Sequence, residues 1–155
     1  TQVYDVRPVP RKWLALERTS DVEGRYVNEG MILVTRSGLV GRSTLATNAL
    51  RKVIISDDLL RVISKDSTNT GWIYAYLHSP QAKAMMMGAH YGHIIKHLEV
   101  AHLSDLPVPM VAPKIAEQYN VKKSKILKLR NDALRLQLKA ESKTIRCSGS
   151  QSGSR

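Results

Sequence analysis

Two arginines and two glycines share a short segment that directly follows a run of β-branched residues. In the stretch ILVTRSGLVGRS, residues 32–43, Arg36 and Arg42 flank Gly38 and Gly41. Glycine adopts tight-turn conformations and lets a backbone approach another group closely. The planar guanidinium of arginine bonds a phosphate, or the O6 and N7 atoms of guanine, through two hydrogen bonds. The residue types in this turn therefore suit recognition of an anion.

The turn does not match either common nucleotide-binding loop. The P-loop needs four residues between its glycines and then Lys-Ser or Lys-Thr, whereas here Leu39 and Val40 separate the glycines and Arg42 replaces the lysine. The dinucleotide-binding loop needs three glycines, and this stretch has two. Two interpretations remain open. The arginines bind a DNA phosphate or a guanine edge, or the glycines form a structural hairpin turn whose arginines face water.

Clustered histidines are a second candidate for chemistry. His93 and His97 are four residues apart, which places them on one face of a helix. A zinc site needs further ligands, but the segment has no HExxH motif and no neighbouring cysteine. The sequence therefore predicts no metal site in the cluster, which comprises His90, His93, His97 and His102.

Asp57 and Asp58 resemble the acidic pair of a metal-dependent nuclease. They stand between two predicted strands, however, where aspartate is a routine turn residue. The chain contains no nucleophile elbow and no serine or cysteine triad signature. We therefore expect a binding module without catalytic residues, and a small nuclease remains the less favoured alternative.

The elements that position these residues follow from periodicity and turn signals. Short strands and helices alternate, which predicts a mixed α/β (α+β) fold. Ser79-Pro80 is typical of a helix start and Gly88 of its end, and the three methionines of that helix are expected to fill the core. The predicted strands are 13–16 at an edge, 31–35, 52–56 and 59–64, and the predicted helices are 71–78 and 80–88.

The C-terminal part has a different pattern, because residues 114–143 contain neither glycine nor proline. Apolar residues recur there at alternating steps of three and four, as in a coiled coil. A helix of some thirty residues, roughly 45 Å long, cannot bury such a stripe on a small domain alone, so we expect it to pair with another long helix. Leu127, Leu134 and Leu138 widen the stripe. Its central positions, called the apolar seam below, are Ile126, Leu129, Ala133, Leu136 and Ala140.

Composition sets limits on the class of protein. The chain has 155 residues, 43% hydrophobic and 24% charged, as in an ordinary globular domain. No apolar run approaches the ~20 residues of a membrane span, the first residues lack the apolar core of a signal peptide, and Cys147 is the single cysteine. These features predict a cytoplasmic protein without a disulfide framework and without a membrane partner.

Charge is the most informative quantity. The formal net charge is +11 on 17.3 kDa, and the sequence pI is about 10.0. Such an excess indicates a polyanionic partner, first of all nucleic acid. A basic surface that only aids solubility, or a basic helix that pairs with an acidic subunit, would give the same balance.

Five segments in this order resemble the DNA-specificity subunit of type I restriction-modification systems. They are VNEGMILVTRSGLVGRS, ISDDLLRVI, GWIYAYLHSPQAK, YGHIIKHLEVAHLSDLPVP and APKIAEQ, which opens the long helix. Each motif is weak alone, and the resemblance, long helix included, covers about residues 26–140. The chain looks like the later half of one target-recognition domain followed by a spacer helix. A full subunit carries two of each, and the Trp-Leu-Gly opening of a recognition domain is replaced here by Trp13-Leu14-Ala15.

The resemblance implies non-enzymatic, sequence-specific binding of double-stranded DNA. It implies a recognition domain at 1–111 and a spacer helix at 112–146, and the polar composition of residues 147–155 predicts a disordered tail. The helix would pair with a second recognition half or another copy and dock a DNA methyltransferase (modification) subunit. S-adenosylmethionine, ATP and magnesium would be held by partner subunits, and this chain would need no cofactor. The alternative is an interaction module that assembles such subunits with little DNA contact.

On this interpretation the turn and the segment after Gly88 face DNA. His90 and Tyr91 would lie in a turn after that glycine. The expected DNA contacts are Arg36, Ser37, Gly38, Arg42, Ser43, His90, Tyr91 and Lys96. The charged side of the helix, which carries Lys125, Lys128 and Lys139, is expected to tolerate exchange without loss of helix pairing.

Overall fold

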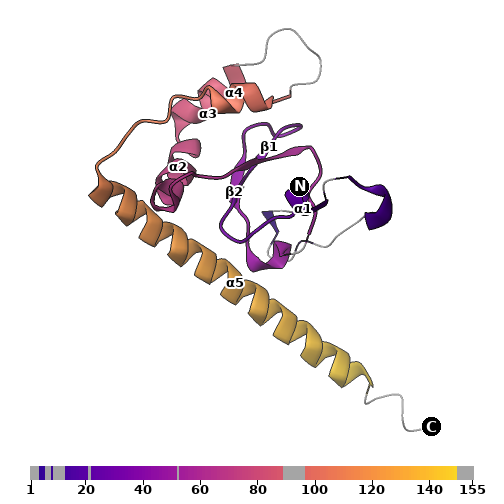
Figure 1. Cartoon of the computed structure of the whole chain (residues 1–155). Coiled ribbons are helices and arrows are strands. Elements are labelled where there is room, and N and C mark those ends of the chain that lie inside the picture. Colours follow the sequence, from indigo (N-terminus) through magenta and orange to yellow (C-terminus); the bar gives the residue numbers. More distant parts are fainter. Residues whose placement is uncertain are drawn as a thin grey trace, which may run out of the picture.

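The computed structural model describes residues 4, 5, 8, 13–20, 22–51, 53–88 and 97–149, with the side chains of the last helix described as far as Lys143. A small sheet and several short helices form an α+β domain, and one long helix runs along its side (Figure 1). The predicted fold class is confirmed. In chain order the elements are η2 (Leu16–Arg18), α1 (Val22–Arg25), β1 (Ile32–Thr35), β2 (Ser43–Leu45), η3 (Asn48–Leu50), β3 (Leu59–Val62), η4 (Ser67–Asn69), α2 (Thr70–Leu77), α3 (Pro80–Gly88), α4 (Val100–Ser104) and α5 (Pro113–Gly149), where η denotes a 3-10 helix.

The sheet has the order β2-β1-β3 and both of its pairs are antiparallel. Ile32 of β1 lies opposite Leu45 of β2 and Val62 of β3. All four residues of β1 are buried, as expected for a β-rich ILVT sequence in a central strand. The strand therefore holds the two segments that flank the glycine turn in a fixed register.

Apolar residues cover both faces of β1. Ile32 and Val34 point to the larger cluster, whereas Leu33 points to the smaller one, because side chains alternate along a strand. The larger cluster also contains Leu45, Tyr76, Leu77, Ala82, Met86 and Leu98. The smaller cluster adds Val27, Ala46 and Leu50. Residues of α2, α3 and the segment before α4 thus close one face of the sheet.

The predicted start of α3 is confirmed. Ser79 Oγ accepts a hydrogen bond from the Ala82 backbone N–H at 3.1 Å, Pro80 occupies the first helical position, and the helix ends at Gly88. The prediction that all three methionines fill the core is wrong for two of them. Met86 is buried, whereas Met85 and Met87 are exposed, because successive helical residues point about 100° apart.

Two predicted strands are not formed. Within 52–56 the described residues 53–56 contribute only an isolated bridge from Ile54 to Tyr26, and Val53 and Ile55 pack, partly buried, on the smaller cluster. Near the N-terminus Trp13 is 92% exposed and the 3-10 helix η2 begins at Leu16, so residues 13–16 do not form the predicted edge strand. The sequence also gave no indication of β2 or of the single-turn helix α4.

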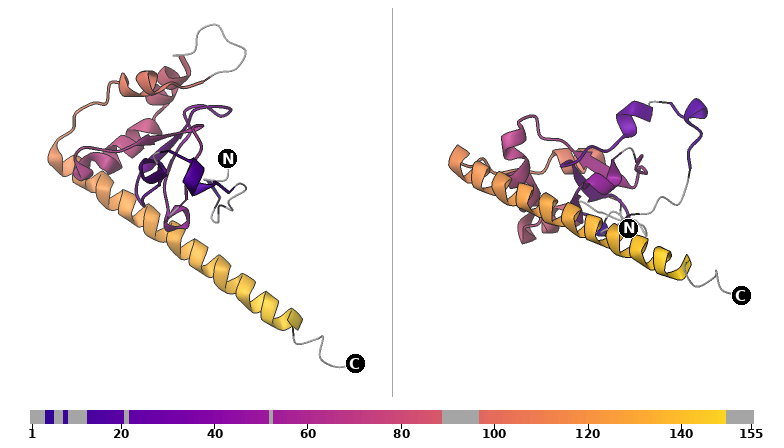
Figure 2. Two further views of the ribbon diagram at one scale, coloured as in Figure 1. Left: turned by 45° about the vertical axis from the view of Figure 1, so that its right-hand side comes forward. Right: turned by 90° about the horizontal axis from the view of Figure 1, so that it is seen from below.

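Helix α5 begins at Pro113 and continues to Gly149, which agrees with the predicted helix at 112–146. It extends into the stretch predicted to be disordered from 147, since no proline or glycine stands inside it before Gly149; residues 150–155 lie outside the described part. Its N-terminal half packs along the domain, and its C-terminal part extends beyond the domain in all three views (Figures 1 and 2).

Candidate nucleic-acid interface

The glycine turn between β1 and β2 is held by its own backbone. Thr35 N–H donates to Arg42 O at 2.9 Å, and Gly41 N–H donates to Thr35 O at 3.0 Å. The buried hydroxyl of Thr35 accepts from Arg42 N–H at 3.0 Å. Gly38 and Gly41 have φ of +72° and +75°, a conformation that other residues rarely adopt. The glycines are therefore required by the turn itself.

Gly41 also makes the close approach that its lack of a side chain permits. A Cβ atom built there would lie 3.3 Å from Met86 Cβ. At Gly38 no described atom lies within 4 Å of the equivalent position. The group that approaches Gly41 is thus a core methionine of α3, and the hairpin interpretation accounts for this glycine.

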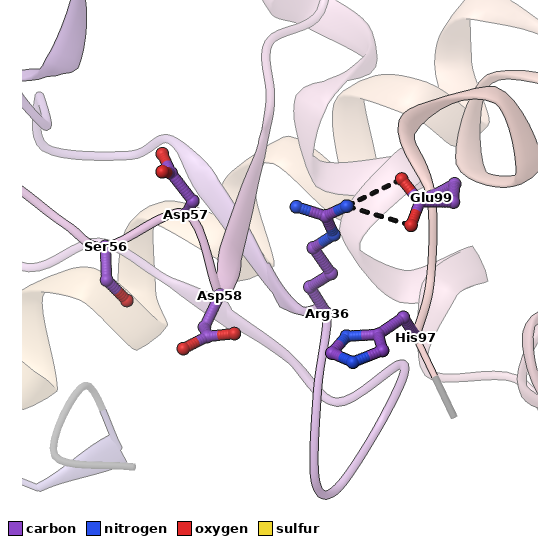
Figure 3. A pocket seen from close by; sticks show the side chains of 6 residues that line it. All are labelled: Arg36, Ser56, Asp57, Asp58, His97 and Glu99. Carbon is purple, nitrogen blue, oxygen red and sulfur yellow. Dashed lines mark hydrogen bonds and ion pairs between the residues drawn. The ribbon is translucent and has the colours of Figure 1, made fainter. Parts of the chain in front are cut away.

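Arg36 is engaged inside the chain. Its Nη2 donates to Glu99 Oε1 at 2.8 Å and to Oε2 at 2.7 Å, and the side chain is 31% exposed (Figure 3). The hydrogen bond from Arg36 lowers the pKa of the Glu99 carboxyl, and the same bond raises the pKa of Arg36. The Arg36 guanidinium can therefore contact DNA only if it leaves Glu99 or binds Glu99 and DNA together.

Glu99 should confer acid sensitivity on this corner of the domain. Because its pKa in the folded chain lies below its ordinary value of 4.5, the ionised carboxylate contributes stability that is present above about pH 4.5 and is lost as pH falls through the lowered pKa. Glu99→Gln should lower the urea midpoint at pH 7 and flatten its decline between pH 5 and pH 3.

Urea unfolding followed by circular dichroism at successive pH values measures this effect. Glu117→Gln, at an exposed glutamate on α5, is the matched control and should keep the wild-type curve. Parallel curves for wild type and Glu99→Gln would show that the Arg36–Glu99 pair contributes nothing to folding.

Asp57 and Asp58 line an open cavity of about 400 Å³, together with Arg36, Ser56, His97 and Glu99 (Figure 3). Ser37 Oγ donates to Asp58 Oδ1 at 2.7 Å, and Asp57 forms a long ion pair of 3.7 Å with Arg25. Among the described residues no group of three or more His, Cys, Asp or Glu side chains is arranged to hold a metal ion. Among the charged residues that line the cavity, Arg36 and Glu99 pair with each other, whereas Asp57 and Asp58 have partners that do not line it.

Arg42 and Ser43 have opposite environments. Arg42 is exposed, and its guanidinium lies 4.2 Å from the ring centroid of Tyr4, a cation–π contact. Ser43 is 7% exposed within β2, and its Oγ lies 3.2 Å from His78 Nδ1. A phosphate contact by Ser43 would require β2 to move. Of the five candidates in the turn, Arg42 is the basic residue that is open to a ligand.

The other expected DNA contacts, His90, Tyr91 and Lys96, lie outside the described residues, as does His93. Two histidines of the cluster can be placed. His97 is exposed and pairs with Ser37 across a backbone bridge, and His102 Nδ1 accepts from the Glu99 N–H at 3.3 Å. The described part of the chain does not gather these histidines into one site.

Helix α5 is fixed to the domain by residues that the sequence analysis did not single out. Asn120 Oδ1 accepts from Gly71 N–H at 3.2 Å, and its Nδ2 donates to Ser67 O at 3.1 Å. Further along, Arg130 Nη1 donates to Thr44 Oγ1 at 2.7 Å and to Leu45 O at 3.2 Å. Asn131 reaches Asn48 and Glu29.

The packed side of α5 has a signal that was available in the sequence. Asn120, Leu127 and Arg130 recur at steps of seven and three, with buried Ala116 one turn earlier. These residues form a second helical stripe beside the apolar seam. Because Asn120 and Arg130 are polar, apolar periodicity alone does not indicate this stripe. Leu127, which was assigned to the seam, packs against the larger core cluster instead.

Among the described residues there is no second long helix to cover the apolar seam. Ile126, Leu129 and Leu136 are 37%, 59% and 65% exposed. Ala133 is partly buried and Ala140 is exposed. The globular part occupies one side of α5, and the seam lies on another. The expected partner helix therefore stays a prediction, with its surface open in the single chain.

None of the helices formed by the described residues combines the length and apolar character needed to cross a bilayer. A scan against protein-family models and a search of curated proteins gave no match to this chain.

Proposed function

We propose that the chain is the DNA-specificity component of a type I restriction-modification system, one target-recognition half with its spacer helix. The observation that carries the proposal is that two sides of α5 have different environments. One side of the helix is anchored to the α+β domain through Asn120 and Arg130, while the seam at Leu129 stays open. A helix that sets the distance between two recognition domains needs both properties.

On this proposal the chain binds double-stranded DNA in the cytoplasm and performs no chemistry. A modification subunit supplies methyl transfer from S-adenosylmethionine, and ATP and magnesium act on partner subunits. The seam takes a second recognition half or another copy of the chain. The net charge of +11 supports a polyanionic partner, since each neutralised phosphate releases counterions.

A second candidate function is an interaction module that assembles subunits with little DNA contact. It is favoured by the internal pairing of Arg36 with Glu99 and of Ser37 with Asp58, because these two turn residues are already satisfied. For the nuclease alternative, Asp57 pairs with Arg25 and Asp58 with Ser37, so both aspartates already have partners within the chain. Selection from randomised duplexes, with the modification subunit present, separates the first two functions by whether one sequence is enriched.

Arg42→Ala tests the turn directly. If Arg42 binds phosphate, the affinity for selected and random duplexes should fall alike and the salt slope should flatten by about one unit. If it reads guanine, the affinity for the selected duplex alone should fall about ten- to a hundredfold, which corresponds to one good bidentate base contact. Fluorescence anisotropy across a salt series measures both quantities.

Arg51→Ala is the control, because Arg51 is also exposed and follows η3 rather than the turn. It should leave both affinities near the wild-type values. Wild-type binding by the folded Arg42→Ala chain to every duplex would reduce the RSGLVGR segment to a structural turn.

A further inference from the structure

A second surface of α5 remains after the domain contacts and the apolar seam are accounted for. Six basic residues, called the basic stripe below, share one arc of the helix, and all six are exposed. With about 100° per residue, the centre of this arc lies about 90° from the seam and about 130° from the side that contacts the domain. The basic stripe consists of Lys114, Lys125, Lys128, Arg135, Lys139 and Lys143.

The stripe concentrates the charge of the chain. Residues 113–143 contain nine Lys or Arg and three Asp or Glu, a net +6 out of +11 for the chain. Two of the acidic residues, Glu117 and Asp132, lie within the same arc, and Asp132 bonds Arg135 at 3.0 Å. The six basic residues therefore leave an excess of four positive charges along about 44 Å of helix.

Pairing through the seam would leave most of the stripe open. Lys128 and Arg135 lie about 120–140° around the axis from the centre of the seam, beyond the reach of a helix packed on Leu129. The centre of the stripe also lies about 130° around the axis from the side of α5 that contacts the domain. The stripe is therefore a surface of α5 that is separate from the apolar seam and from the side packed on the domain.

We infer that the basic stripe binds the phosphate backbone of double-stranded nucleic acid without reading sequence. Five of its six members are lysines, which act as point charges toward phosphate. Val121 is the apolar residue within the arc, so the stripe lacks the apolar core that protein interfaces carry, and lysine is depleted in such interfaces. A straight row of cations matches the regular negative charge of a duplex.

An anionic membrane surface fits the stripe less well. Helices that lie in a bilayer interface place Trp, Phe and Leu beside the basic residues. The neighbouring seam of α5 has no aromatic residue, and Lys122 interrupts its N-terminal continuation toward Ile115. The choice of nucleic acid among polyanions rests on the proposed function, and the use of the stripe as the contact rests on its own geometry.

The test replaces three stripe lysines together, as Lys125→Gln, Lys128→Gln and Lys139→Gln in one chain. Glutamine keeps the helix propensity. A matched triple, Arg51→Gln, Lys65→Gln and Lys83→Gln, removes the same charge from exposed sites outside α5. Binding of a random-sequence duplex across a salt series should show a slope flattened by about two to three units for the stripe triple, since each lost phosphate contact removes about 0.9. The matched triple should change the slope by less than about one unit.

Two results of the duplex assay would overturn the inference. One is equal flattening of the salt slope by both triples, which indicates an effect of net charge alone, and the other is no flattening by the stripe triple. Vesicles with anionic lipid provide a further arm, and binding of the wild type to vesicles but not to duplex would also overturn it. Sequence selection separates this inference from the proposed function. If the stripe triple keeps the wild-type salt slope and one sequence is still enriched, the proposed function is supported and the role of the stripe is rejected. If the stripe triple flattens the salt slope and no sequence is enriched, the role of the stripe is supported and the proposed function is rejected.

Discussion

Gly71→Ala should separate α5 from the domain and lower the free energy of unfolding by about 1–3 kcal/mol, the usual range for overpacking a closely packed contact. A Cβ atom at this position would lie 2.4 Å from the backbone O of Tyr119 and 2.5 Å from the backbone N of Asn120. Backbone atoms cannot rotate away as a side chain does, so α2 and α5 must move apart. That movement also breaks the bond from Gly71 N–H to Asn120 Oδ1.

Urea denaturation followed by circular dichroism measures the loss, and limited proteolysis shows whether α5 is released. Gly88→Ala is the matched control. Gly88 is also helical, and no described atom lies within 4 Å of its added Cβ, so the change should be neutral or stabilising by up to about 1 kcal/mol. An unchanged urea midpoint for Gly71→Ala would contradict the packing of α2 on α5 described above.

The parts of the fold that could be predicted from the sequence are those fixed by local patterns. Helices α3 and α5 have start signals in Ser79-Pro80 and Pro113, and three of the four residues of β1 are β-branched. The strand β2, residues 43–45, has no such run and exists because β1 pairs with it. Residues 52–56 have such a run, but the described residues 53–56 form only the bridge from Ile54 to Tyr26, and Val53 and Ile55 pack on the smaller cluster.

The candidate site was predictable only as a set of residue types. The spacing of Arg36 and Arg42 suggested two equivalent arginines. Arg36 instead pairs with Glu99, sixty-three residues later in the chain, and no local pattern reports a partner at that separation. The three-and-four spacing located the apolar seam on α5, but it could not show that Leu127 belongs to the side packed on the domain.

Leu129→Asp should leave the isolated chain folded and abolish its pairing through α5. Leu129 is 59% exposed, so an aspartate there is solvated in the single chain and should change its stability by less than about 0.5 kcal/mol. In a paired state the same position would lie at the centre of the seam between Ile126 and Ala133. A carboxylate buried there without a partner costs several kcal/mol or more, depending on solvation, which is enough to remove a coiled-coil contact.

Val121→Asp provides the matched control for that prediction. Val121 lies on the same helix with almost the same exposure, 60%, but about 80° around the axis from Leu129 and off the seam. Sedimentation velocity of the chain, alone and with the modification subunit, should show a complex for wild type, for Val121→Asp and for the triple replacement of Lys125, Lys128 and Lys139. Of these variants, only Leu129→Asp should sediment as a monomer, both by itself and with the modification subunit. An unaltered complex with Leu129→Asp would place the partner contact elsewhere and would remove the physical basis for α5 as a spacer helix.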